Sequence, residues 1–235
     1  MLLQERTEQQ EGLTPKPLRS SLEKRLNARE MSNINLHLGD CLEAMKEMPD
    51  NTYDLAIVDP PYGIGISSNP VRQQHTKKDW DSSIPTQEYF IELQRISKDQ
   101  IIWGGNYFFD YLQSSQCFLI WDKKQPFDFS LAMCEMAWCS FSKPAKMFRY
   151  SVLTERGKIH PTQKPVKLYE WLLDNYAKEG DKILDTHLGS GSIALACHNR
   201  KFDLDAWEID EEYYNNAVER LDTHKSQLTI FDLGG

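Results

Sequence analysis

A carboxylate, two prolines and a tyrosine stand together in the segment Asp59-Pro60-Pro61-Tyr62. Residues 55–58 before it (Leu-Ala-Ile-Val) form a short apolar run that predicts a fully buried strand. Proline has no N–H to donate to a sheet, so both prolines must lie beyond the end of this strand. The sequence therefore places a carboxylate and an aromatic ring at the carboxyl end of a strand, in the crevice where open α/β sheets bind ligands.

These residue types suit a transfer reaction on the exocyclic amino group of a nucleobase. Such a nitrogen is a poor nucleophile because its lone pair is delocalised into the ring. The Asp59 carboxylate and the Pro60 carbonyl could accept its two hydrogens and favour a pyramidal nitrogen with a localised lone pair. Tyr62 offers a ring face on which a base can stack, an interaction worth about 1–3 kcal/mol. The alternative is an ordinary turn that carries a surface tyrosine.

A second motif combines a predicted strand over residues 182–185, a glycine-containing turn and a helix over residues 193–199. Gly189 and Gly191 permit a tight turn and close approach of a ligand to the backbone beside a helix N-terminus. The turn lacks the third glycine of the dinucleotide fingerprint. Glu208 ends the next predicted strand, about twenty residues beyond the turn, where a carboxylate binds ribose hydroxyls. The alternative for Glu208 is a helix-capping or solvated acid.

Asp40 occupies a comparable position near the start of the patterned sequence. A predicted strand over residues 34–38 ends in Gly39-Asp40, and a helix over residues 41–48 follows. Asp40 could cap this helix or accept a hydrogen bond from the amino group of a ligand, and the two roles are compatible.

The formal net charge of −8 argues against indiscriminate nucleic-acid binding, because phosphate contacts need lysine and arginine. Basic residues nevertheless gather after the Asp59 motif and again between residues 143 and 164. Solvated loops are the usual alternative for such clusters, but their position on either side of one predicted site favours contact with DNA. The predicted nucleic-acid-binding residues are Arg72, Lys77, Lys78, Lys143, Lys146, Arg149, Arg156 and Lys158.

The length of 235 residues predicts one α/β domain with embellishments. Five widely spaced cysteines, with no pair at metal-ligand spacing, indicate reduced thiols and argue against a metal site or a disulfide framework. Apolar runs fall short of the length of a membrane span, and the N-terminus has no secretory apolar segment. We therefore expect a cytoplasmic protein without a membrane partner.

Three segments are distinguished by their patterning: a polar N-terminal arm (residues 1–32), an α/β domain (33–223) and a C-terminal tail (224–235). Within the domain the pattern predicts helices over residues 86–97, from Pro165 to about residue 176 and from 211 to about 221. Further strands are predicted over residues 100–103 and 117–121, and residues 131–141 and 145–150 are expected to form a hairpin at the edge of the sheet.

Three motifs together resemble the amino-methyltransferases that act on DNA: Asp-Pro-Pro-Tyr at 59–62, His-Pro-Thr-Gln-Lys-Pro at 160–165, and Asp185 followed by Gly189-Ser190-Gly191. Their order, with the cofactor glycines last, is similar to the β-type permutation of this family, and the resemblance covers residues 33–223. It implies a Rossmann-like, seven-stranded, mostly parallel sheet with an antiparallel edge hairpin, in circularly permuted order. It also implies S-adenosylmethionine as the methyl donor.

The resemblance also implies roles for individual residues. Asp59, Pro60 and Tyr62 would hold a target base flipped out of the duplex, and residues 63–156 would contain the target-recognition surface. The implied cofactor contacts run from the methionine part to the ribose, the adenine and the carboxylate. They comprise Asp40, Cys41, Asp59, Thr162, Lys164, Asp185, His187, Gly189, Ser190, Gly191 and Glu208. Similar proteins often carry phenylalanine where His187 stands, so His187 would pack against the cofactor in the same way or be a core histidine.

Aspartate rather than serine at position 59 favours adenine N6 over cytosine N4 as the target. The expected activity is site-specific methylation of adenine N6 in double-stranded DNA. The chain would be the modification half of a restriction system or a solitary phage or bacterial enzyme. Cytosine N4, an RNA target and a non-catalytic nucleic-acid- or cofactor-binding module are the alternatives.

The C-terminal sequence Gln227-Leu228-Thr229-Ile230-Phe231 resembles the peptide by which bacterial replication proteins dock on the sliding clamp. An extended segment of this kind can place apolar anchors in a groove. The alternative is a tail strand that packs onto its own domain. The sequence is also compatible with a homodimer and leaves the oligomeric state open.

Overall fold

The computed structural model describes residues 32–64, 83–126, 132–151 and 163–232, all within a compact unit that spans Ser32–Gly235. Most of the N-terminal arm (residues 1–31) lies outside these residues. So do Arg72, Lys77, Lys78, Arg156, Lys158 and Thr162 among the predicted site residues.

The described residues form one mixed sheet of eight strands, which confirms the predicted α/β class and adds one strand to the number expected. The strand order is β1-β8-β7-β2-β3-β5-β4-β6. The first five strands in this order are mutually parallel, β5 is antiparallel to β3 and β4, and β6 is parallel to β4. The strands are β1 (Ile34–Leu38), β2 (Tyr53–Val58), β3 (Ser97–Trp103), β4 (Phe118–Asp122), β5 (Cys134–Cys139), β6 (Lys146–Arg149), β7 (Lys182–Asp185) and β8 (Asp203–Glu208).

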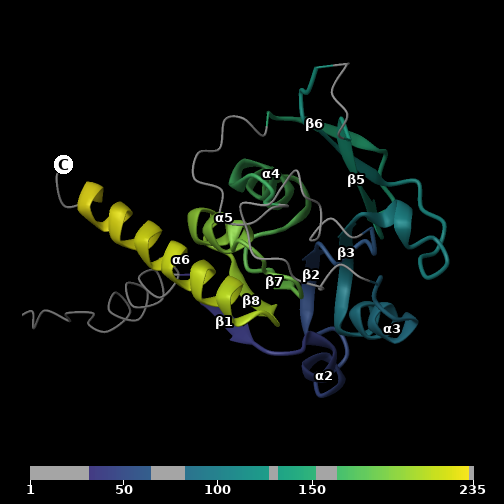
Figure 1. Cartoon of the computed structure of the whole chain (residues 1–235), viewed down its shortest axis with the longest axis horizontal. Coiled ribbons are helices and arrows are strands. Elements are labelled where there is room, and N and C mark those ends of the chain that lie inside the picture. The colour runs from purple at the N-terminus through teal and green to yellow at the C-terminus, as the bar shows by residue number, and fades with distance from the viewer. Residues whose placement is uncertain (1–31, 65–82, 127–131, 152–162, 233–235) are drawn as a thin grey trace, which may run out of the picture. The chain divides into compact units, whose positions relative to one another are not determined.

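Helices cover both faces of the sheet (Figure 1). One face packs against α4 (Val166–Tyr176), α5 (Ser192–Arg200) and α6 (Glu211–Asp232); the other packs against α2 (Cys41–Lys46), α3 (Gln87–Ile96) and the 3-10 turn η3 (Gly105–Tyr107). Alternate residues of β2 belong to the two cores, Leu55 and Ile57 to the first, Ala56 and Val58 to the second. Burial on both sides explains why β2 reads as a continuous apolar run.

The predicted edge hairpin of residues 131–141 and 145–150 is wrong, because β5 and β6 do not pair. β5 lies between β3 and β4, where its residues Ala137, Trp138 and Cys139 are buried. β6 is mostly exposed and takes the edge of the sheet instead. Burial of apolar surface therefore decides which of the two segments lies inside the sheet.

The last helix also differs from its prediction. α6 continues to Asp232 rather than ending near residue 221, so residues 227–231 are helical and not an extended tail. Glycine and proline, the residues that usually end a helix, are absent from residues 211–232 of the sequence. Among the described residues, none of the helices combines the length and apolar character needed to cross a membrane.

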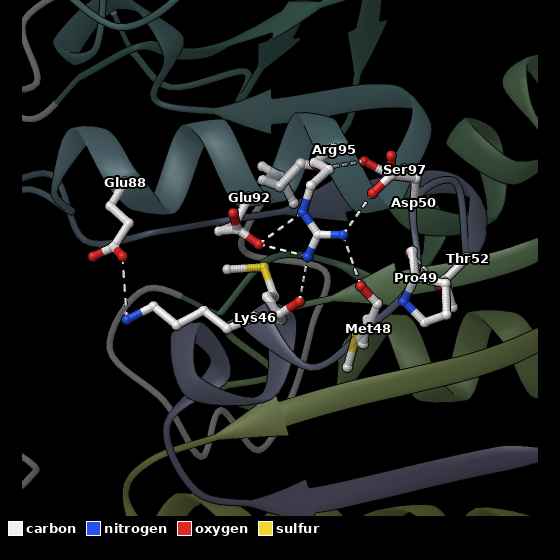
Figure 2. Close-up of polar contacts among 11 residues, drawn as sticks. Lys46, Met48, Pro49, Asp50, Thr52, Glu88, Glu92, Arg95 and Ser97 are labelled. Atoms are coloured by element: carbon white, nitrogen blue, oxygen red, sulfur yellow. Dashed lines mark hydrogen bonds and ion pairs between the residues drawn. The ribbon is translucent and has the colours of Figure 1, made fainter.

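Arg95 on α3 ties this helix to the segment that joins α2 to β2 (Figure 2). Its guanidinium donates to the backbone carbonyl oxygens of Met45 at 2.8 Å and Met48 at 2.7 Å. It also donates to the carboxylates of Asp50 at 2.8 Å and Glu92 at 2.6 Å. One planar guanidinium thus donates to carbonyl groups at and just beyond the C-terminal end of α2. The compact ammonium of a lysine could not reproduce this arrangement of donors.

We expect Arg95→Met to lower the midpoint temperature of unfolding, because two carbonyl oxygens and two carboxylates lose their donor together. Thermal unfolding followed by circular dichroism would measure the change. Arg200→Met is the matched control, since Arg200 pairs with the carboxylates of Asp174 and Glu170 and has no backbone carbonyl partner in the described contacts. An equal loss in both variants would show that the carbonyl contacts of Arg95 contribute nothing.

Candidate active site

Four acidic residues lie at or just beyond the carboxyl ends of four neighbouring parallel strands. Asp40 follows β1, Glu208 ends β8, Asp185 ends β7 and Asp59 follows β2, and the strands lie in this order in the sheet. Backbone hydrogen bonds hold the same edge together, from Gly39 N–H to the Glu208 carbonyl at 2.9 Å and from Leu188 N–H to the Trp207 carbonyl at 2.8 Å. The two motifs predicted from sequence therefore meet at one edge of the sheet.

The Asp59 motif is packed rather than exposed. The Tyr62 hydroxyl donates to Asp59 Oδ1 at 2.6 Å, and its ring stacks on Tyr107 with centroids 5.0 Å apart. Gly104, with φ of +69°, leaves room for this ring, because a Cβ at this position would lie 2.1 Å from a ring carbon of Tyr62. The alternative of a surface tyrosine on an ordinary turn is therefore wrong.

Lys164, just before α4, is buried against the Asp59 motif. Its ammonium contacts Asp59 Oδ2 and lies 3.3 Å from the Tyr62 hydroxyl. A second carboxylate, Glu135 on β5, accepts from the same ammonium at 3.0 Å, and Lys123 Nζ lies 2.6 Å from the other Glu135 oxygen. The Lys164 ammonium thus joins Asp59 and Glu135, and its position near the carboxylate of the cofactor stays a prediction.

Burial and pairing shift the pKa values of this group in different directions. Burial raises the pKa of Asp59, an effect that the ammonium of Lys164 opposes. Burial acts in the same sense on Glu135, but Lys164 and Lys123 outweigh it and lower the pKa of Glu135 to about 2. Burial and the nearby carboxylates raise the pKa of Tyr62 well above its ordinary value, so its phenol stays protonated and remains a donor.

The glycine turn between β7 and α5 is held from two sides. The Glu208 carboxylate accepts from the backbone N–H of Gly189 at 2.8 Å and of Asp210 at 2.9 Å. Arg220 on α6 donates to the Ser190 carbonyl at 2.8 Å. Gly191 has φ of +73°, and a Cβ there would lie 3.0 Å from the Cβ of Ala217. Glu208 therefore fixes the turn, and a ribose contact would have to use its remaining acceptor capacity.

Just before this turn in the sequence, a chain of hydroxyl contacts links α3 to His187. The Tyr89 hydroxyl lies 2.6 Å from Thr186 Oγ1, which lies 2.9 Å from His187 Nδ1. The rings of Tyr89 and His187 meet edge to face with centroids 5.5 Å apart. Burial lowers the pKa of His187 to about 4, so its imidazole is neutral at pH 7. The neutral ring therefore adds no positive charge beside the acidic residues at the ends of the parallel strands.

Asp185 is 2% exposed, and its carboxylate accepts the backbone N–H of His187 at 3.0 Å. Burial raises the pKa of Asp185 to about 8, and the neighbouring carboxylates Asp59 and Glu208 act in the same direction. Asp40 accepts the backbone N–H of Leu42 at 2.8 Å, which confirms its capping role for α2. Burial likewise raises the pKa of the Cys41 thiol to about 12.

The three described members of the predicted nucleic-acid-binding set lie toward the β6 side of the molecule. β6 runs in the same direction as β2. Arg149 therefore lies at the carboxyl end of its strand, on the same side of the sheet as Asp59, whereas Lys146 lies at the amino end, on the opposite side. Lys143 lies over the rings of Phe141 and Tyr176 at 5.1 and 5.0 Å. Lys143 and Lys146 are therefore not gathered around Asp59.

Sequence patterns missed several residues of this site: Lys123, Glu135, Tyr89, Gly104 and Tyr107. Glu135 carried a usable signal, because it is a single charge within the apolar strand segment 131–141. Within the described ranges, clusters of three or more histidine, cysteine, aspartate or glutamate residues suited to a metal ion are absent.

Comparison with known proteins finds two methyltransferases of similar sequence. The Type II methyltransferase M.HpaI of Haemophilus parainfluenzae is 34% identical over 94 residues, which make up 39% of this chain and 29% of that protein. The Type II methyltransferase M.HinfI of Haemophilus influenzae is 26% identical over 78% of this chain and 67% of its own length. The chain thus spans less than a third of M.HpaI and about two thirds of M.HinfI.

Among solved structures, the M1.HpyAVI–SAM complex superposes with a TM-score of 0.58 at 22% identity, over 80% of this chain and 100% of that one. This similarity supports the fold. The sequence profile of the N6/N4 DNA methylases matches residues 102–219, half of the sequence, including the glycine turn and Glu208. The chain belongs to the N6/N4 family of DNA methylases.

Proposed function

We propose that this protein transfers a methyl group from S-adenosylmethionine to the N6 amino group of adenine in DNA. The observation that carries the proposal is the meeting of the Asp59 motif and the glycine turn at adjacent ends of β2 and β7. A base amino group held by Asp59 would lie beside a ligand bound at the turn. Methyl transfer requires that the amino group and the methyl donor lie side by side.

The residues at the turn suit S-adenosylmethionine, the ligand named for M1.HpyAVI. The ligand carries an ammonium, a sulfonium and ribose hydroxyls, and the edge offers carboxylates and a glycine backbone that a ligand can approach closely. Its sulfonium makes the methyl carbon open to attack by a nucleophile. The proposed contacts are Asp40, Cys41, Asp185, His187, Gly189, Ser190, Gly191 and Glu208. Asp59, Lys164 and Thr162, the last of which lies outside the described residues, are kept as further proposed contacts.

The Asp59 carboxylate and the Pro60 carbonyl would accept hydrogen bonds from the target amino group once the base leaves the stack. The lone pair of the nitrogen would form a bond to the methyl carbon, the electron pair of the broken carbon–sulfur bond would stay on sulfur as a neutral thioether, and one proton of the amino group would pass to solvent. Lys164 and the Tyr62 hydroxyl keep Asp59 oriented and favour its ionised form against the effect of burial, which raises the pKa of Asp59. Tyr62, stacked on Tyr107, presents aromatic surface beside the base.

Cytosine N4 is the second candidate target, because its amino group would make the same hydrogen bonds and the family contains both activities. Aspartate at position 59 favours adenine. An RNA target would use the same pocket, and a non-catalytic binding module would retain the fold without turnover. The names of M.HpaI and M.HinfI support a place in a restriction–modification system.

Two proposed partners rest on sequence alone. The clamp-binding peptide at residues 227–231 is helical in this structure, so docking in extended form would require the end of α6 to unwind. A homodimer is the other proposal. No contact among the described residues bears on either partner.

Nucleoside analysis tests the proposed reaction directly. Unmethylated double-stranded DNA is incubated with the protein and S-adenosylmethionine, digested to nucleosides and analysed by mass spectrometry. We expect to detect N6-methyl-2′-deoxyadenosine. N4-methylcytosine would keep the mechanism and overturn the assigned target. Absence of any methylated nucleoside, with the cofactor bound, would contradict the proposal.

Asp59→Asn keeps the size of the side chain and removes the charged acceptor. We expect its methylation rate constant at saturating substrates to fall by about a hundred- to a thousandfold, because the interaction with the reacting amino group is lost. Calorimetry should show cofactor affinity within a few-fold of the wild type. A variant that methylates DNA at the wild-type rate would remove Asp59 from the reaction.

Cofactor affinity should depend on pH through Asp185. Its carboxyl, with a pKa of about 8 in the free protein, is largely protonated at neutral pH. A bound cation stabilises the ionised form, so binding releases a proton below this pKa. Affinity should therefore rise with pH by up to about tenfold per unit and level off above about pH 8.

Calorimetric Kd values and heats in buffers of different ionisation enthalpy would measure the released proton. The amino group of the ligand titrates in a similar range, so Asp185→Asn is the necessary control. We expect the variant to bind more weakly and to lose the part of the pH dependence that belongs to the protein. Identical pH profiles in both proteins would contradict the role of Asp185.

A further inference from the structure

We infer that Glu135 is a positioning residue that shares the Lys164 ammonium with Asp59 and so leaves Asp59 able to accept the hydrogen bond of the target amino group. Lys123 balances Glu135 from its other side. The inference rests on the proposed methylation, because sharing the Lys164 ammonium affects function only if Asp59 binds the reacting amino group.

The strands bring the four charges together from distant parts of the sequence. Glu135 lies opposite Trp121 in the antiparallel β4–β5 pair, close to the carboxyl end of β4, and Lys123 follows that strand. The backbone N–H of Lys123 donates to the Met133 carbonyl at 3.0 Å, which holds Lys123 beside Glu135. Lys164 reaches the same place from the start of α4.

Contacts alternate in sign along this group. Asp59 contacts Lys164, Lys164 lies 3.0 Å from Glu135 Oε2, and Glu135 Oε1 lies 2.6 Å from Lys123. The side chain of Lys164 is 2% exposed and that of Lys123 10%. Two carboxylates and two ammonium groups make the set neutral. A single buried ammonium would otherwise be held by Asp59 alone.

Stability alone is a weak reason for the second pair. Burying a charge costs free energy that the attraction between partners often only offsets, and an Asp59–Lys164 pair would already be neutral. Glu135 and Lys123 add two further charges to the buried group. Their effect on Asp59 is specific: Glu135 draws the ammonium toward itself, and Lys123 limits how strongly it does so.

Removing each outer charge should therefore affect Asp59 in opposite directions. Without the charge of Glu135, Lys164 binds Asp59 alone, and the ionised form of Asp59 is stabilised. Without Lys123, Glu135 depends on Lys164 alone, draws it away, and the ionised form of Asp59 is destabilised. The groups that face Asp59 from the surrounding elements are Lys164, Tyr169, Glu135, Lys123, Asp185, Tyr89 and Tyr62.

The test compares the pH profiles of kcat/KM for DNA at saturating cofactor, which report ionisations of the enzyme before DNA binds. Glu135→Gln should move the acidic limb to lower pH by about one unit, and Lys123→Met should move it to higher pH by a similar amount. In Glu135→Gln, kcat on the plateau should also fall by about ten- to a hundredfold, because Asp59 is held by Lys164. Cofactor affinity should stay within a few-fold of the wild type in both variants.

Asp205→Asn is the matched control. Asp205 also pairs with a lysine, Lys182 at 2.6 Å, and accepts from the Tyr53 hydroxyl at 2.9 Å, but these partners begin β7 and β2 at the opposite edge of the sheet. Its removal should reduce thermal stability and leave the acidic limb in place. Thermal unfolding of all three variants would separate folding defects from positioning.

Opposite movements of the acidic limb in Glu135→Gln and Lys123→Met would support the inference. If the acidic limb moved in the same direction in both variants, or stayed in place in a variant that folds, the inference would be overturned. The methylation proposal would remain intact. Absence of methylation by the wild-type protein would overturn the proposed function itself, and the inference with it.

Discussion

A buried ion pair joins the two parts of this molecule on which the site depends. Asp59 directly follows β2, and Lys164 lies just before α4, 105 positions later in the sequence. Neither charge would be stable alone at this depth, since an unpaired buried charge costs several kcal/mol. The pair therefore fixes the start of α4 against the end of β2, and Tyr62, Glu135 and Lys123 arrange themselves around it.

The parallel half of the sheet explains why so many acidic groups meet there. Parallel strands end at a common edge, so the residues that follow β1, β8, β7 and β2 are brought together although they are widely separated in sequence. Backbone N–H groups stabilise some of these carboxylates, as Gly189 does for Glu208. Asp185 likewise accepts the backbone N–H of His187, yet burial raises the pKa of both carboxyl groups. An edge of this kind favours a ligand that carries positive charge and hydroxyl groups.

Local sequence patterns were sufficient for much of the fold. The apolar run before Asp59, the stripe of α4 and the turn at Gly189 each depend on residues close together in the chain, and each appears where predicted. Placement of the antiparallel strands depended instead on which segment could bury more apolar surface, and this is why β5 enters the sheet between β3 and β4. The end of α6 was missed because a polar segment without glycine or proline can remain helical.

The site shows the same division. Asp59, Tyr62, Asp185 and Glu208 were recognisable from motifs, whereas Glu135, Lys123 and Tyr107 join the site only through strand pairing and packing that no spacing in the sequence reveals. Lys164 was recognised, but its partner was not, because its contact with Asp59 follows from how α4 docks on the sheet.

The most direct test is the titration of Asp59 in the protein without DNA. Carbon-13 NMR of labelled aspartate carboxyl groups, with the Asp59 signal assigned by its absence in Asp59→Asn, would measure its pKa. A midpoint clearly above the ordinary value of about 3.9 is the predicted result, because burial and the sharing of Lys164 with Glu135 both oppose ionisation. A midpoint at or below that value would contradict it and would show that Lys164 is held by Asp59 alone.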